Sequence, residues 1–369
     1  MKNTYDFIVI GAGIAGCTFV SSLNKRFPEA SILVIEHGRR LGGRSTSRQS
    51  RKNPILQFDH GLSSIAFSNF LSKELRTFIS PLIKSEKLIE ISKDILFINE
   101  FGNMNNVLNN QTIYRSVPLM INFSQEIINQ SINHIKINYL FQTFIQSLRY
   151  KDNLWEVQIN KERSIRSKNL ILSSSLIAHP RCLKILNIKT LPLREAIRKG
   201  KDDLIDSLII KLRQQDFVKR KNYILYVSKL DIIENFHYKY LQIWFEKSII
   251  VASNFEKIIF QKQFDGTMII ILNCLFYEGF FDINSSQIIE SLMSIFIKHK
   301  NFLDLFSYAS LIDQMYWRSS QPINNLLPKD LQWSSKSKIG FCGDWIDHSG
   351  CGGVERAMKS SIRLAGLLN

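Results

Sequence analysis

The sequence has no apolar run long enough to cross a membrane, which takes about 20 residues as a helix. The nearest approach is the ten-residue stretch 268–277, which is apolar except for Asn273 and is typical of a buried strand. Near the start, only residues 7–10 are continuously apolar before Gly11, which is too short for the core of a secretory signal. We therefore expect no transmembrane segment and no export by this route.

Cysteine is scarce, and its five copies are dispersed as Cys17, Cys182, Cys274, Cys342 and Cys351, with no CxxC pair. This odd, scattered set argues against a disulfide framework and a zinc site, and it favours a reducing compartment, so we expect a cytoplasmic protein. The sequence also has no HExxH pattern and no evident Ser/His/Asp set. We expect no metal.

The formal net charge of +16 comes without a block of Lys and Arg interleaved with aromatic residues. A nucleic-acid partner requires a clustered basic footprint. The chain is also rich in Ile, Asn and Lys, whose codons are A/T-rich, so genome composition accounts for the charge as readily as an anionic partner does. We expect no nucleic-acid partner.

What the sequence does contain is a glycine-rich turn between a short apolar strand and a helix-like segment. Residues 7–10 lead into Gly11-Ala-Gly13-Ile-Ala-Gly16, and an apolar run at residues 32–35 ends in Glu36. Gly11 permits a tight turn, Gly13 lets a pyrophosphate approach the backbone, and Gly16 lets the helix pack against the strand. The spacing predicts a dinucleotide-binding βαβ unit whose helix N-terminus faces the phosphates and whose Glu36 binds a ribose.

The predicted helix after this turn buries one face, made of Ala15, Phe19, Val20 and Leu23. Six residues after Glu36 comes Gly42-Gly43-Arg44, which narrows the dinucleotide to FAD.

The middle of the chain has few motifs but clear element patterns. We predict helices over residues 68–90, 117–132 and 287–298, turns over 99–110, a strand at 135–139, a hairpin through Lys151-Asp-Asn and a buried strand from Asn169. Apolar runs at residues 204–212, 223–227, 240–252 and 268–276 have the spacing of an antiparallel sheet. A C-terminal helix is expected to follow Gly353 and to bury Val354, Ala357, Met358, Ile362 and Ala365.

Together, GAGIAG, Glu36, GGR, FDHG at 58–61, WRSSQP at 317–322 and GDW…GGVERA at 343–357 resemble the renalase-like FAD-dependent oxidoreductases, within the monoamine oxidase-like flavoprotein superfamily. The resemblance spans the chain and is dense at its two ends. It implies an α/β Rossmann-like FAD-binding domain with an antiparallel-sheet α+β substrate domain, or cap. We expect residues 1–66, 112–178 and 323–369 in the first, and residues 67–111 and 179–322 in the second.

The resemblance also implies which residues contact a non-covalent FAD. Gly11, Gly13 and Gly16 would contact the pyrophosphate, Glu36 the ribose, and Arg44, with Arg39, the phosphate or ribityl oxygens. Asp59, His60 and Gly61 would pass beside the flavin ring, and the backbone of Phe144 would lie near the adenine. The complete set of cofactor-binding candidates is Gly11, Ala12, Gly13, Ile14, Ala15, Gly16, Glu36, His37, Arg39, Gly42, Gly43, Arg44, Asp59, His60, Gly61, Phe144, Gly343, Asp344, Gly352, Gly353 and Val354.

At the C-terminal end, Gly343 and Asp344 would hold the ribityl–phosphate chain, and Gly353 and Val354 would present a helix N-terminus to the flavin. That helix end stabilises the negative charge that develops near N1 and O2 on reduction. Arg356 and Ser361 depart from the small residue and the glycine of many relatives. Ser361 is small enough for close packing, whereas Arg356 must point outward or toward a ligand.

His60 and Trp317 are the candidate catalytic residues. His60 either orients substrate or tunes the flavin, or makes a structural hydrogen bond; Trp317 either stacks beside the ring or packs in the core. The expected reaction is hydride transfer from a small C–H donor, an amine or a dihydronicotinamide-like molecule, to flavin N5, with reoxidation by O₂. The alternatives are a flavin desaturase or isomerase acting on an apolar substrate, and a non-enzymatic flavoprotein.

Overall fold

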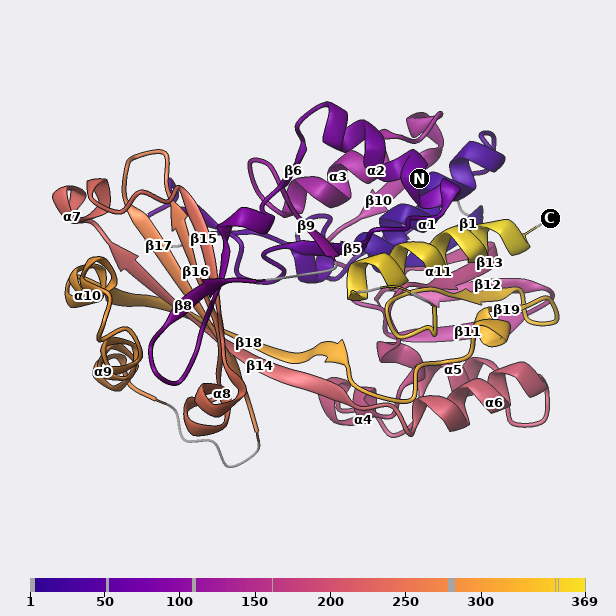
Figure 1. Ribbon diagram of the computed structural model, residues 1–369. Helices are drawn as coiled ribbons and strands as arrows, with labels where there is room; N and C mark the ends of the chain where they lie inside the picture. The colour runs from indigo at the N-terminus through magenta and orange to yellow at the C-terminus, as the bar shows by residue number, and fades with distance from the viewer. Residues whose placement is uncertain are drawn as a thin grey trace.

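The computed structural model describes residues 4–50, 53–107, 111–160, 162–277, 283–348, 350 and 352–368. Two lobes lie side by side, and the long strands β14 (Phe217–Val227) and β18 (Ser310–Pro322) run from one toward the other (Figure 1). The C-terminal helix α11 (Gly353–Leu367) lies in the same lobe as the first strand (Figure 1). The two ends of the chain therefore build one domain.

The first lobe is built on an eight-stranded sheet in the order β10-β2-β1-β13-β12-β11, with β20 beside β13 and β19 beside β20. Strands β10, β2, β1, β13 and β20 are parallel where they pair. The bounds are β1 Thr4–Ile10, β2 Ile32–Ile35, β10 Ile137–Leu140, β11 Ser147–Lys151, β12 Leu154–Gln158, β13 Ser164–Leu172, β19 Trp333–Ser334 and β20 Ile339–Phe341.

Both faces of this sheet are covered, as a parallel sheet requires. Alternate residues of β1 point to the two faces of the sheet. Phe7 and Val9 belong to a first hydrophobic core on one face, and Ile8 and Ile10 belong to a second core on the other face. The first core contains α1 (Ile14–Arg26), α2 (Lys73–Lys84), α3 (Ile121–Asn129) and α11; the second contains α4 (Arg181–Leu186), α5 (Pro192–Ala196) and α6 (Asp203–Leu212). Helix α1 is buried from Ile14 to Asn24, because it lies between the sheet and helices α3 and α11.

The second lobe is a seven-stranded sheet, the cap sheet, in the order β18-β14-β17-β16-β15-β7-β8. It is antiparallel except where β15 pairs with β7. Its other strands are β7 Ile95–Ile98, β8 Met104–Asn106, β15 Tyr240–Phe245, β16 Phe255–Lys262 and β17 Met268–Leu275, and helices α7 Leu230–Glu234, α8 Lys247–Ser253, α9 Ser285–Ile295 and α10 Lys300–Ser307 belong to this lobe (Figure 1).

Small strands connect the lobes. Strands β3 (Arg48–Gln49) and β4 (Gln57–Phe58) form one pair, and β5 (Ile65–Ser68), β9 (Gln111–Ser116) and β6 (Leu88–Glu90) form a three-stranded sheet. Single 3₁₀ turns stand at Gly43–Ser45, Ser92–Asp94, His134–Lys136, Leu176–Ala178 and Lys329–Gln332.

The expected mixed fold, with a Rossmann-like domain and an antiparallel cap, is confirmed. The hairpin at β11 and β12 is confirmed too, with Asp152 and Asn153 at positive φ, as a two-residue type I′ turn requires. The expected buried face of α1 is buried at all four positions, whereas Val354 and Ile362 on α11 are only partly buried.

Several element predictions are wrong. Residues 204–212 form helix α6 and not a strand, because the Asp202 side chain accepts the N–H groups of Leu204 and Ile205 and caps the first turn. Residues 240–252 are divided between strand β15 and helix α8. The helix predicted over 68–90 is shorter, since Ser72 caps α2, Phe70 is 88% exposed, and residues 88–90 are strand β6.

The domain boundaries also need correction. Helices α4 to α6 share their core with the eight-stranded sheet, so residues 179–212 belong to the first lobe, although we expected them in the cap. The segment 67–111, also expected in the cap, is divided between the lobes. Its helix α2 packs in the first-lobe core, whereas its strands β7 and β8 join the cap sheet. The predicted turns at 99–110 contain strand β8, and their last three residues lie outside the described residues.

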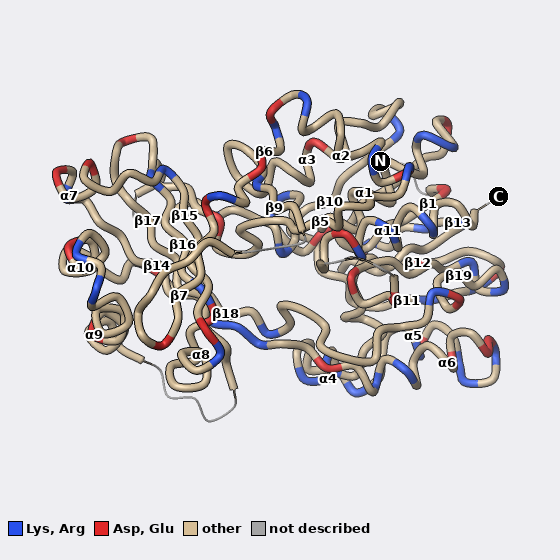
Figure 2. The backbone as a smooth tube through the Cα atoms, in the orientation of Figure 1, with Lys and Arg blue, Asp and Glu red and all other residues tan. Residues whose placement is uncertain are grey.

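The charges are spread over the whole molecule. Figure 2 shows Lys and Arg in both lobes, interspersed with Asp and Glu. Within the described ranges, no helix is both long and apolar enough to span a bilayer, and no three His, Cys, Asp or Glu side chains gather as a metal site.

Candidate functional site

The predicted glycine turn sits where β1 passes into α1, and its packing explains two of its glycines. Gly11 has φ +102°, and a Cβ there would lie 2.4 Å from the Ser173 hydroxyl. A Cβ on Gly16 would lie 2.1 Å from the Gly11 carbonyl oxygen. Ser173, at the end of β13, donates to the carbonyls of Ile10 and Gly11, at 3.0 and 2.9 Å. The sequence reasoning missed this serine, because it follows a strand 160 residues away.

Gly13 differs from its two neighbours in the motif. A Cβ on it would meet nothing closer than 3.9 Å, so its lack of a side chain is not explained by protein packing. Gly13 is also the N-cap of α1 and makes no side-chain cap hydrogen bond. The space beside it and the uncapped helix N-terminus have the character of an anion-binding site.

Glu36 and the GGR segment close around this turn. The Glu36 carboxylate accepts the N–H of Ala12 at 2.7 Å and the N–H of Gly38 at 2.6 Å. Gly42 donates its N–H to the Ala12 carbonyl at 2.8 Å and forms a parallel bridge with Gly13. Both Gly42 and Gly43 have positive φ, +118° and +54°, which glycine adopts without strain.

The adenine-side candidates also come together. The carbonyl of Glu36 accepts the N–H of Thr143 at 3.0 Å, which brings residues 142–144 beside the end of β2. There the rings of His37 and Phe144 meet edge to face, with centroids 5.5 Å apart. Arg39 is exposed.

Segments from opposite ends of the sequence meet at Arg44 and Asp344. The Arg44 guanidinium pairs with the Asp344 carboxylate through two bonds, at 2.6 and 2.8 Å, and also donates to the Ser320 carbonyl at 2.6 Å. Asp344 is buried, and a Cβ on Gly353 would lie 3.3 Å from its Oδ2 atom. This ion pair therefore joins the GGR segment to the N-terminus of α11, whose N-cap Gly352 makes no side-chain cap bond.

Helix α11 is fixed against α1 and β5. The Ser361 hydroxyl donates to the Ala15 carbonyl at 2.9 Å, so the small residue expected here does permit close packing. Glu355 is fully buried, accepts both the N–H and the hydroxyl of Ser68, and pairs with Lys359 at 2.6 Å. Arg356 is partly buried, and its Nε atom has no hydrogen-bond partner among the described residues.

Loop 58–61 passes between the two lobes. His60 is 2% exposed and stacks on Trp317, with ring centroids 5.5 Å apart, and the Trp317 indole N–H donates to the His60 carbonyl at 3.3 Å. Neither ring nitrogen of His60 has a hydrogen-bond partner within the described part of the chain. Burial, together with nearby arginines, lowers the pKa of His60 to about 4, so the ring is neutral near pH 7.

Asp59, by contrast, points into a protein network. Its carboxylate accepts from the Ser47 hydroxyl at 2.6 Å, the Met120 N–H at 2.9 Å, and Arg115 and Gln261 at 3.3 and 3.4 Å. These contacts give Asp59 a role in holding the lobes together. Gly61 is required by close approach, since a Cβ would lie 2.2 Å from the Arg44 carbonyl oxygen.

Arg181, at the start of α4, is a second cation near Arg44 that the sequence reasoning missed. Its Nη2 donates to the Ser175 hydroxyl at 2.9 Å, and its guanidinium lies 3.8 Å from the centroid of Phe217. Its Nε and Nη1 atoms are buried and unpartnered among the described residues. Burial lowers the pKa of Arg181 to about 10, and the nearby Arg44 charge acts in the same direction.

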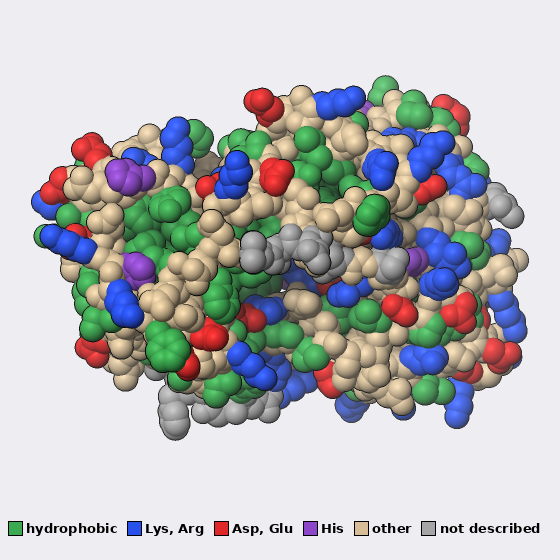
Figure 3. Space-filling view, viewed as in Figure 1, with side chains coloured by type: hydrophobic (Ala, Val, Ile, Leu, Met, Phe, Trp, Pro, Cys, Tyr) green, Lys and Arg blue, Asp and Glu red, His purple; other side chains and the backbone are tan. Residues whose placement is uncertain are grey.

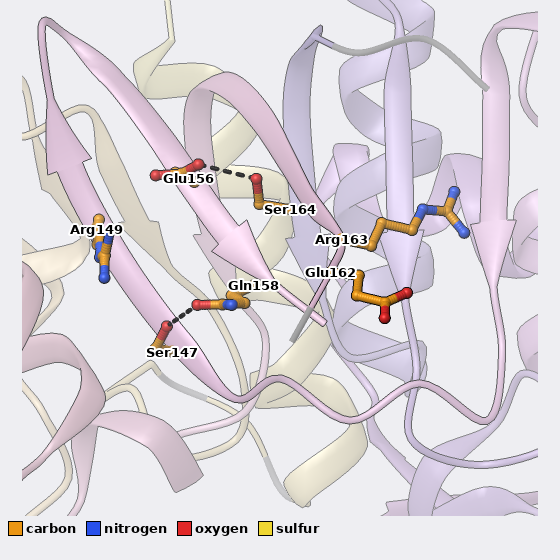
Figure 4. A pocket seen from close by; sticks show the side chains of 7 residues that line it. All are labelled: Ser147, Arg149, Glu156, Gln158, Glu162, Arg163 and Ser164. Carbon is orange, nitrogen blue, oxygen red and sulfur yellow. Dashed lines mark hydrogen bonds between the residues drawn. The ribbon is translucent and has the colours of Figure 1, made fainter. Parts of the chain in front are cut away.

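A separate hollow lies beside strands β11 and β12 and the start of β13. Figure 4 shows its side chains, among them Arg149, Glu156 and Gln158, with hydrogen bonds from Ser164 to Glu156 and from Ser147 to Gln158. It shares no residue with the predicted site, and its polar groups are largely paired with each other. In the space-filling view the surface is also hollowed where the lobes meet (Figure 3).

Comparison with known proteins supports the fold. Residues 9–80 match the family described as an NAD(P)-binding Rossmann-like domain. An uncharacterized protein of Methanocaldococcus jannaschii is 27% identical over 199 residues, which are 49% of this chain and 51% of that protein. The chain thus matches about half the length of this curated relative.

Solved structures are similar over nearly the whole chain. Wild-type putrescine oxidase bound to putrescine has a TM-score of 0.62 at 10% identity, covering 98% of each chain. A fatty acid isomerase of P. acnes that produces CLA also has a TM-score of 0.62, at 9% identity over 99% of each chain. A flavoprotein/dehydrogenase of Cytophaga hutchinsonii has 0.54 at 10% identity, covering 99% of this chain and 77% of its own. This chain therefore has the fold of these solved structures, and its residues 9–80 match a Rossmann-like domain.

Proposed function

We propose that this chain is an FAD-dependent oxidoreductase of renalase-like type, which oxidises a small C–H donor, an amine or a dihydronicotinamide-like molecule. When bound non-covalently, FAD would accept a hydride from the donor carbon at N5, and O₂ would reoxidise it by taking up two electrons, the transferred hydrogen and one proton from solvent to give H₂O₂. The observation that carries the proposal is the Arg44–Asp344 pair, which joins the N-terminal glycine motif to the GD…GGV segment about 300 residues later.

The residues around the glycine turn fit the phosphates of FAD. The open space beside Gly13 admits a phosphate, and the uncapped N-terminus of α1 supplies N–H donors and partial positive charge. Arg44 adds a fixed cation, and the free guanidinium nitrogens of Arg181 add donors nearby. Glu36 is held by two backbone N–H groups at the end of β2, where its remaining lone pairs can accept from ribose hydroxyls.

At the other end of the cofactor, the uncapped N-terminus of α11 begins beside Asp344. Its N–H groups would stabilise negative charge on the reduced pyrimidine ring. His60 lies in loop 58–61, between the two lobes, and Trp317 lies on strand β18 of the cap sheet. We propose that these two residues position the donor molecule. His60 is neutral and retains one donor and one acceptor nitrogen for this purpose.

The similarity to a fatty acid isomerase supports a second candidate, redox isomerisation or desaturation of an apolar substrate. The fold is shared equally with putrescine oxidase, so fold alone does not choose between these reactions. A non-enzymatic flavoprotein is the third candidate.

The test begins with gentle purification and a visible absorbance spectrum. We expect flavin absorbance that leaves with the released cofactor after denaturation, because the binding is non-covalent. Anaerobic mixing with amines, reduced nicotinamide isomers and unsaturated fatty acids should then bleach the flavin with one class, and air should restore it with formation of H₂O₂. Purified protein without flavin, and unable to take up added FAD, contradicts the proposal.

A further inference from the structure

A row of polar side chains crosses the face of the cap sheet that looks toward loop 58–63. The register pairs Asn222 on β14 with Asn273 on β17, and Asn273 with Lys257 on β16. Their sequence neighbours Tyr223, Leu272 and Ile258 belong to the core on the opposite face of the sheet. Partners in adjacent strands lie about 5 Å apart, so the three side chains form one continuous line.

The two asparagines carry buried oxygen atoms that nothing satisfies. Asn222 and Asn273 are 1% and 3% exposed, and the Oδ1 atom of each lacks a hydrogen-bond partner in the described part of the structure. The orientation of Asn222 is fixed, because its Nδ2 donates to the His60 carbonyl. An unpaired buried acceptor costs about 1–3 kcal/mol, so two of them in one line point to a ligand that donates N–H or O–H groups.

Lys257 ends the row with a positive charge. Its Nζ donates to the Ser63 hydroxyl at 3.0 Å, which leaves two of the three ammonium protons for other acceptors. The neighbouring Glu256 is paired with Arg220 at 2.8 Å, and the Arg220 charge opposes the effect of Glu256 on Lys257. Burial, together with the Arg220 charge, lowers the pKa of Lys257 to about 8, which leaves the ammonium form in the majority near pH 7.

This row belongs to the same region as the proposed flavin site. The His60 carbonyl accepts from both Asn222 and Trp317, and Gly61 packs against the Arg44 carbonyl. The row therefore contacts the same loop that packs against Arg44. It lies on the cap side of this loop, where a donor molecule would bind.

We infer that the substrate is an amino-carboxylate: a small molecule with an N–H donor group for Asn222 and Asn273 and a carboxylate for Lys257. The inference rests on the proposed function and narrows its substrate class. A diamine would place a second cation against Lys257, and an apolar chain would leave both asparagine oxygens unpaired in a water-poor site. An amino-carboxylate satisfies all three groups at once.

Three matched probes test the inference through flavin absorbance changes on the oxidised holoprotein, without need of turnover. Benzylamine, benzoate and 2-aminobenzoate share one ring and differ in charge and in an N–H donor. We expect benzoate to bind at least about tenfold more tightly than benzylamine, and 2-aminobenzoate more tightly again, since about 1.4 kcal/mol corresponds to a factor of ten.

Two variants test the lysine and the asparagine parts of the row separately. Lys257→Met should abolish the preference for benzoate over benzylamine, whereas Asn273→Leu should abolish the advantage of 2-aminobenzoate over benzoate. Lys247→Met and Asn235→Leu change exposed residues of the same lobe and should leave both preferences intact. Each variant is first checked for its flavin content, so that a folding defect is recognised.

The outcomes distinguish a failure of the inferred substrate class from a failure of the proposed function. A holoprotein that binds benzylamine as tightly as benzoate, or a Lys257→Met variant that keeps the preference, overturns the inference and leaves the proposed function standing. A protein that takes up no flavin overturns the proposed function itself.

Discussion

At the scale of single residues, Glu36 is a candidate ribose-binding carboxylate that backbone N–H groups hold in place. Glu36 is expected from the spacing alone, and the structure adds that two N–H groups, those of Ala12 and Gly38, orient it. Its position after β2 follows from the apolar run that ends there, which is why the sequence could predict it. The N–H contacts could not be predicted, because they depend on how the glycine turn folds back.

Glu36→Ala should weaken FAD binding by about 10- to 100-fold, since hydrogen bonds to a charged group are worth about 1.5–3 kcal/mol. Glu36→Gln retains one acceptor oxygen and should lose less. The measurement is the dissociation constant of FAD for the apoprotein by fluorescence quenching. Glu29→Ala removes an acid that is 81% exposed and should have no effect. Unchanged FAD affinity in Glu36→Ala would show that the ribose is held elsewhere.

His60 makes stability depend on pH in a predictable direction. Burial holds its folded pKa at about 4, below the unfolded value of 6.5. The unfolded state therefore binds more protons between these values. The stabilisation from neutral His60 is complete above pH 6.5 and is lost as the pH falls toward 4, by about 1.4 kcal/mol per unit at most.

His60→Phe keeps a ring against Trp317 but removes the titration. We expect the free energy of unfolding in urea to fall less between pH 7 and pH 5 in this variant than in the parent. The burial-lowered pKa values of His179 and His348 act in the same direction in both proteins and cancel in the comparison. His237→Phe, at an exposed position, should retain the parent's pH dependence. Equal slopes for His60→Phe and parent contradict the assignment.

At the scale of elements, two glycines of the glycine turn differ in what requires them. Packing requires Gly16, whereas ligand binding is the expected reason for Gly13. A Cβ on Gly16 would collide with the Gly11 carbonyl oxygen, whereas a Cβ on Gly13 would meet only ordinary contacts at 3.9 Å. Gly13 also has φ −73°, which alanine adopts freely.

Gly16→Ala should therefore lower the thermal midpoint of the apoprotein by several degrees, because α1 must move away from β1. Gly13→Ala should leave that midpoint nearly unchanged and lose FAD, because the new methyl group occupies space beside the phosphates. Calorimetry of both apoproteins and FAD titration make the comparison. A Gly13→Ala variant that binds FAD with parental affinity would exclude the pyrophosphate from this position.

The success of the sequence predictions also depends on the element. The βαβ unit and C-terminal helix were predictable, since their motifs fix strand, turn and helix locally. The apolar run at 204–212 predicts a strand, but the structure has a helix there, and the buried Ile205, Leu208, Ile209 and Leu212 have helical spacing after the Asp202 cap. The row of Asn222, Lys257 and Asn273 could not be predicted, because only the sheet register places three strands' residues side by side.

At the scale of the whole molecule, the lobes are joined by buried polar contacts as well as by the chain. Asp59 binds Ser47 and Met120 in the first lobe, Arg115 on the connecting strand β9, and Gln261 on the cap sheet. A second small core, with Phe58 and Ile95 next to the cap strands, lies at the same junction. Asp59 therefore helps to hold the two lobes together, along with the hydrogen bonds that Asn222 and Trp317 donate to the His60 carbonyl.

Asp59→Ala should destabilise the protein by about 3–5 kcal/mol, because it leaves the largely buried Arg115 guanidinium without its carboxylate partner. Asp231→Ala, which removes an exposed acid paired with Lys229 at 3.6 Å, should change stability by less than about 1 kcal/mol. Urea unfolding measures both. Because Asp59 acts between the lobes, its loss should also raise the KM for the donor more than it weakens FAD binding, which the first lobe supplies. A variant that loses FAD and donor affinity in equal measure would instead place Asp59 beside the flavin.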